Sequence, residues 1–129
     1  MEKSSVLTPQ QLEQNILQKL IVLYQTKLEH QLGHVSCKLV DKTITIVAED
    51  SITGLERFLL KNNQYELAKQ IRLTLHKVLE PHLKFLFEEV MNVPVVDVIC
   101  DSVFQTGRTS IVAVLAAIPD LGSDSIYYL

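Results

Sequence analysis

The spacing of apolar residues switches twice along this chain, and that alternation limits the folds open to it. Residues 12–32 carry Leu, Ile and Tyr at intervals of three and four, whereas residues 35–48 alternate apolar and polar side chains. Helical spacing returns in residues 53–91 and alternation in residues 94–117. The pattern predicts an α+β two-layer sandwich in the order α-β-β-α-α-β-β. Its two hairpins would form a four-stranded antiparallel sheet with the helices on one face.

Capping signals mark where the first two helices begin. Thr8 and Gln11 have the spacing of a capping box, and Thr53 and Glu56 repeat it before a short helix that runs to about residue 61. We expect Gly33 to end the first helix in a left-handed conformation.

A long third helix is predicted from about residue 64 to residue 91, with Asn63 as its cap. Pro81 removes one helical hydrogen bond, so we expect either a kink near residues 77–81 or two abutting helices. The predicted buried side consists of Leu67, Ile71, Leu75, Val78, Leu79, Leu83, Leu86 and Val90.

The first hairpin is predicted from its register. A tight turn at Asp41 and Lys42 pairs Leu39 with Ile44, and this places the strong apolar residues of both strands on one side. The second hairpin begins after Pro94 and turns at residues 105–108. Its predicted core-facing residues are Val96, Val98, Cys100, Ile111, Ala113 and Leu115.

The opposite side of the sheet is unusually apolar for a solvent-facing surface. It is predicted to carry Ile99, Val103, Val112, Val114, Val40 and Val47, together with Asp97 and Asp101. An apolar face of this kind needs a cover. Either the C-terminal tail or a helix lies across it, or a second copy or another partner does.

Length and charge limit the class of protein. The 129 residues fit one domain at residues 1–118 followed by a polar tail at residues 119–129. The net charge is −3, and the basic residues of 57–84 are interleaved with glutamates, so nucleic-acid binding is not expected. No apolar run is long enough to span a bilayer, so we expect no membrane insertion and a cytoplasmic protein.

Residues that carry chemistry do not assemble into a recognisable catalytic or metal site. The four histidines lack ligand spacing, no cofactor motif is present, and Asp97 and Asp101 are about 13 Å apart along a strand, too far for a shared acid–base role. Cys37 and Cys100 are predicted to be reduced core residues. The sequence thus predicts no enzyme, no metal and no cofactor. Arg72, His76 and Arg108 are the candidates for a ligand site between sheet and helices.

An ordered set of short motifs gives a family resemblance. They are Thr53-x-x-Glu56-x-x-Leu59, Arg72, Asn92-Val93, Asp101, Thr106-Gly107 and Ile111-Val112, after an apolar first helix. With these, the chain resembles the bacterial YbcI-like family, a domain of unknown function. The resemblance implies the same order of elements. It implies no activity, cofactor or catalytic residue.

These observations favour a non-enzymatic protein-interaction or regulatory module that forms a homodimer and binds an unidentified protein. The alternative is a sensor that binds a small ligand between its sheet and its helices.

Overall fold

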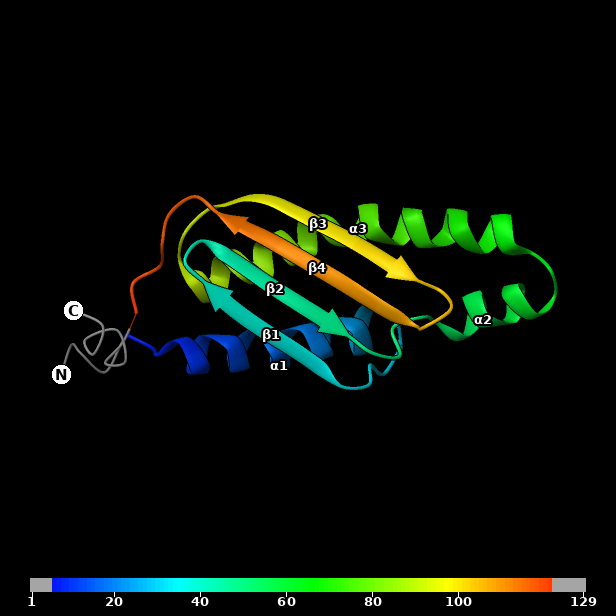
Figure 1. Ribbon diagram of the computed structural model, residues 1–129, viewed down its shortest axis with the longest axis horizontal. Helices are drawn as coiled ribbons and strands as arrows, with labels where there is room; N and C mark the ends of the chain where they lie inside the picture. Colours follow the sequence, from blue (N-terminus) through cyan, green and yellow to red (C-terminus); the bar gives the residue numbers. More distant parts are fainter. Residues whose placement is uncertain (1–5, 122–129) are drawn as a thin grey trace.

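The structure, a computed structural model, describes residues 6–121, and these form three helices and four strands (Figure 1). In chain order they are α1 (Pro9–Lys27), β1 (Val35–Val40), β2 (Thr43–Ala48), α2 (Gly54–Lys61), α3 (Tyr65–Met91), β3 (Val95–Val103) and β4 (Arg108–Leu115). The predicted α+β class and element order are confirmed.

The strands form one antiparallel sheet in the order β1-β2-β4-β3. Figure 1 shows α1 and α3 side by side behind this sheet, while its front carries no helix. The predicted two-layer arrangement, with the helices on one face, is therefore confirmed.

The core lies between the sheet and the two long helices. Apolar side chains of α1, α3, β2 and β4 fill it, and the fully buried ones include Ile16, Leu20, Tyr24, Ile44, Ile46, Leu83, Phe87, Ile111 and Leu115. One face of every strand points into this layer, and a shift of one residue would turn a strand's apolar side chains away from it. Burial of these side chains therefore fixes the register of the sheet.

The first hairpin has the predicted register. Leu39 pairs with Ile44 and Cys37 with Ile46. Asp41 adopts a φ of 53° in the two-residue turn, the left-handed conformation that such turns require and that Asp tolerates.

The second hairpin contains an irregularity that alternation alone did not predict. The register shifts between Val95 and Asp97, so Val95 is 4% exposed while Val96 is 60% exposed. The placement of Val96 in the core was therefore wrong, because a β-bulge moves the inward position back by one residue. The turn agrees with prediction, since Gly107 adopts a φ of 76°.

The first helix ends earlier than predicted. It stops at Lys27, and the backbone N–H groups of Leu28 and His30 both donate to the carbonyl of Tyr24. The left-handed residue is Glu29, with a φ of 50°, so the prediction that Gly33 ends the helix was wrong. Gly33 instead donates its N–H to the carbonyl of Glu49.

The third helix also differs from the prediction in its N-cap residue and in which of its residues are buried. Gln64 occupies the N-cap without a side-chain hydrogen bond, and Asn63 adopts a left-handed φ of 61°. The helix runs through Pro81 without interruption, so two abutting helices are excluded.

Leu67 and Val78 are 45% and 58% exposed, although both were assigned to the buried side of α3. The buried side is centred instead on residues such as Ala68, Arg72 and Leu79. The spacing of apolar residues could not predict that Arg72 lies on the buried side, because it assigns charged residues to the solvent side.

Candidate functional site

The outer face of the sheet carries the apolar side chains that the sequence predicted for it. Val40, Ile99 and Val103 are 59%, 58% and 47% exposed. Val47, Val112 and Val114 lie between or beside them and are half-buried. Within residues 6–121 no helix covers this face (Figure 1).

Charged side chains stand on opposite edges of the same outer face. Lys38 on β1 belongs to a cross-strand row that continues through Thr45 and Val112 to Ile99 on β3. Asp97 and Asp101 flank Ile99 on β3, and both are exposed. The outer face thus carries a basic side chain on its β1 edge and acidic side chains on its β3 edge, with Val47, Val112 and Val114 on the two middle strands.

Arg108 lies at the start of β4 and is engaged with a neighbour. Its Nε donates to both carboxylate oxygens of Glu49, at 3.1 and 3.0 Å. Both side chains of this ion pair are more than one-third exposed.

Arg72 lies in a buried ion pair that joins α3 to α2. Its Nε donates to Oε2 of Glu56 at 2.7 Å, and its Nη2 donates to the carbonyl of Ser51 at 3.1 Å. Burial raises the pKa of Glu56, but hydrogen bonds from Arg72 and Thr53 and the charge of Arg72 lower it overall. Among the described residues, Nη1 of Arg72 is buried without a hydrogen-bond acceptor.

A chain of hydroxyl groups leads from this ion pair to the third strand. The Ser51 hydroxyl lies 2.6 Å from that of Thr109, which is 2.6 Å from the hydroxyl of Ser102. Nε2 of His76 lies 3.1 Å from the Ser102 hydroxyl. Because the carbonyl of Ser51 accepts from Arg72, Ser51 connects Arg72 through these hydroxyl groups to His76.

His76 also lines a small cavity between α3 and β3, of about 210 Å³. Burial and the nearby charge of Arg72 lower the pKa of His76, while Asp101 and Glu56 partly oppose the shift. The other residues that line this cavity are Lys77, Glu80, Val98 and Cys100. The cavity does not include Arg108, so the three ligand candidates do not form one site.

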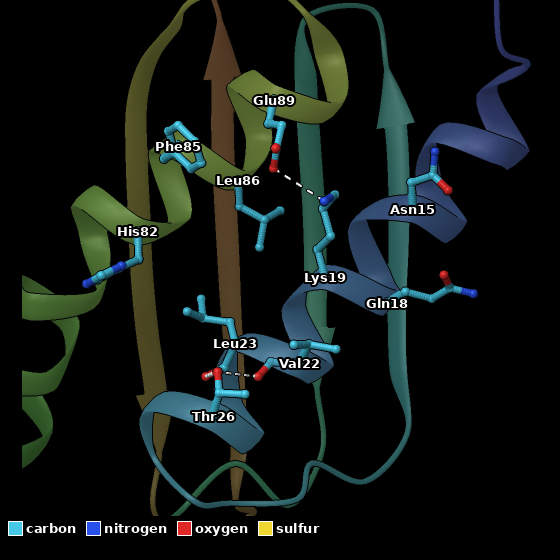
Figure 2. A pocket seen from close by; sticks show the side chains of 10 residues that line it. All are labelled: Asn15, Gln18, Lys19, Val22, Leu23, Thr26, His82, Phe85, Leu86 and Glu89. Atoms are coloured by element: carbon cyan, nitrogen blue, oxygen red, sulfur yellow. Dashed lines mark hydrogen bonds and ion pairs between the residues drawn. The ribbon is translucent and has the colours of Figure 1, made fainter.

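A larger groove lies between α1 and α3 on the side away from the sheet, with a volume of about 520 Å³ (Figure 2). Val22 and Phe85 line it and are 53% and 65% exposed. Lys19 and Glu89 form an ion pair across it at 3.3 Å. Sequence reasoning missed this groove, because isolated apolar residues on a helix's solvent side give no periodic signal.

Both cysteines are unpaired, half-buried residues on the helix-facing side of the sheet. Burial, reinforced by the charge of Glu13, raises the pKa of Cys37 to about 12. Burial and Glu80, partly opposed by Arg72, raise the pKa of Cys100 to about 11. Neither thiol has the lowered pKa of a nucleophile.

Residues 6–121 contain no cluster of metal ligands and no helix long and apolar enough to span a membrane. No group of three or more His, Cys, Asp or Glu side chains there has the geometry to hold a metal ion. No helix in that range has both the length and the hydropathy to cross a membrane.

Comparison with protein families gives one match. A family model described as "Na+-translocating membrane potential-generating system (MpsC)" matches residues 8–117. The match overturns the resemblance to the YbcI-like family, whose short motifs were too weak singly to identify a family. Comparisons with curated proteins and with solved structures found no match.

Proposed function

The chain belongs to the MpsC family, and on that premise we propose that it is a non-enzymatic protein-interaction component of a Na+-translocating membrane potential-generating system. It acts in the cytoplasm as a self-associated module. The observation that carries the proposal is the outer sheet face, where Val40, Ile99 and Val103 stay about half exposed in the single chain.

Burial of this face supplies the driving force for association. Moving an aliphatic side chain of this size from full exposure to full burial contributes about 1.5–3 kcal/mol, so burying the exposed half of each such side chain contributes about 1 kcal/mol. A contiguous apolar face on a small protein is typical of an interaction surface.

The arrangement of ionisable groups supports a role without catalysis. Arg72 and Glu56 neutralise each other in the interior, and Arg108 is engaged by Glu49 at the surface. The burial of both thiols favours their protonated, unreactive forms.

Light scattering coupled to size-exclusion chromatography tests the proposal. The wild type is expected at about twice the chain mass of 14.6 kDa at micromolar concentration. Val112→Asp places a charge in the middle of the face and is expected to give a folded monomer. Val78→Asp is the control, because it makes the same substitution at a valine that is exposed on α3, in the layer behind the sheet. A wild type that is monomeric at all concentrations refutes self-association.

One observation favours a second function, the binding of a small ligand. Nη1 of Arg72 is buried without an acceptor among the described residues, and a ligand oxygen would satisfy it. Native mass spectrometry tests this function, because a bound molecule adds a fixed mass that denaturation removes. A mass equal to that of the bare chain or of its bare dimer under gentle conditions counts against it.

A further inference from the structure

We propose that two copies pack outer face to outer face about a two-fold axis that runs parallel to the strands. Lys38 of each copy then lies against Asp97 and Asp101 of the other. The inference rests on the proposed self-association and adds the partner, its orientation and the residues that fix it.

Symmetry leaves two principal arrangements for such a pair. In an aligned sandwich the strands of the two sheets run within about 30° of each other, so the axis lies between the sheets, either along the strands or across them. An axis along the strands reverses the lateral order, so that β1 of one copy covers β3 of the other. An axis across the strands places β1 on β1 and β3 on β3.

The charges on the outer face distinguish these arrangements. An axis across the strands opposes Lys38 to its own counterpart and brings Asp97 of one copy onto Asp101 of the other, because these residues lie in cross-strand rows on either side of the row of Lys38. Like charges facing each other across an interface oppose binding.

An axis along the strands removes both repulsions. The row Lys38, Thr45, Val112, Ile99 then lies over the same row in reverse, so Lys38 stands opposite Ile99 and between the two flanking aspartates. Val112 meets Thr45 in the middle, and the charged groups form the rim. Charged groups at the rim of a protein interface are usual, because its fully buried core is depleted of charged residues.

The same axis determines where the other surfaces lie. The groove between α1 and α3 opens away from the sheet, so each copy keeps its groove accessible (Figure 2). Figure 1 shows the corner between α2 and α3 extending beyond the end of the sheet. An axis along the strands places both corners at the same end of the dimer, whereas an axis across the strands places them at opposite ends.

Charge reversal tests the pairing. Lys38→Glu and Asp101→Lys are each expected to raise the dimer dissociation constant about tenfold, the effect of a rim charge pair. The double variant restores opposite charges across the interface and is expected to return within about threefold of wild type. Lys84→Glu, on the exposed side of α3, is the control and leaves the constant unchanged.

Distances between labels test the axis independently. A spin label at Gln64→Cys, in a background with Cys37→Ser and Cys100→Ser, reports the separation of the two corners by double electron–electron resonance. The distance expected is that of two α2–α3 corners at the same end of the dimer, as an axis along the strands places them. Labels at opposite ends, or a double charge variant that stays as weak as either single one, overturn the inference while self-association stands. A wild type that is monomeric overturns both.

Discussion

The carboxylate of Glu56 and the guanidinium of Arg72 form a two-pronged ion pair inside the protein, with Nε to Oε2 at 2.7 Å and Nη2 to Oε1 at 2.5 Å. Their side chains are 0% and 5% exposed. Thr53 caps α2 and also donates its hydroxyl to Glu56 at 2.7 Å. One carboxylate thus joins the start of α2 to the N-terminal third of α3.

Removing the charge of Glu56 should destabilise the fold strongly. Glu56→Gln leaves the Arg72 guanidinium buried without a counter-charge, and breaking a buried pair in this way costs about 3–5 kcal/mol of unfolding free energy. Urea denaturation at pH 7 measures it. Glu56→Leu combined with Arg72→Leu should recover much of the loss, because the double variant leaves no isolated charge. A single variant as stable as wild type would show that the pair is energetically neutral.

The unfolding free energy should decrease as the pH is lowered, in two separate pH ranges. The folded-state pKa of His76 lies below 6.5, so the unfolded chain binds the proton first and stability is lost as the pH drops below about 6.5. The folded-state pKa of Glu56 lies below 4.5, so its contribution is present above pH 4.5 and is lost as the pH falls through the folded value.

His76→Gln separates the two ranges. The variant should lose the change in stability between pH 7.5 and pH 5.5 and keep the steeper loss below pH 4.5. Chemical denaturation at several pH values measures both. An unchanged slope between pH 7.5 and pH 5.5 would assign that proton uptake to another group.

Two glycines should respond to alanine in opposite ways. Gly107 has a φ of 76°, so Gly107→Ala forces a side chain into the left-handed region and should cost about 1–2 kcal/mol. Gly54 opens α2, and a Cβ there would meet no atom within 4 Å. Gly54→Ala should therefore be neutral or stabilise by up to about 1 kcal/mol. Thermal melting of the two variants compares them; equal melting temperatures would contradict the assigned role of Gly107.

The sequence predicted the hairpins well because their signal is local and redundant. Every strand contributes several alternating residues, and one register satisfies both strands of the first hairpin. The same signal failed at Val96, where a bulge reverses the alternation without any change in composition.

The helix ends and the buried polar network were harder to predict. Apolar residues continue from Tyr24 to Leu32, so their spacing did not reveal that α1 stops at Lys27. Arg72 and Glu56 are charged, and a pattern that assigns charge to solvent places both outside. Only their pairing, sixteen residues apart, makes their burial favourable.

The two thiols should be nearly inert in the folded protein. With pKa values of about 12 and about 11, Cys37 and Cys100 hold only about one part in a thousand or less as thiolate at pH 8, against about a quarter for an ordinary thiol. Alkylation by iodoacetamide should therefore run at least about a hundredfold slower in the native state than in urea. Mass spectrometry of timed samples measures both rates and assigns each adduct. Rapid labelling of Cys100 in the native protein would mean that the wall of its cavity opens often enough to expose the thiol.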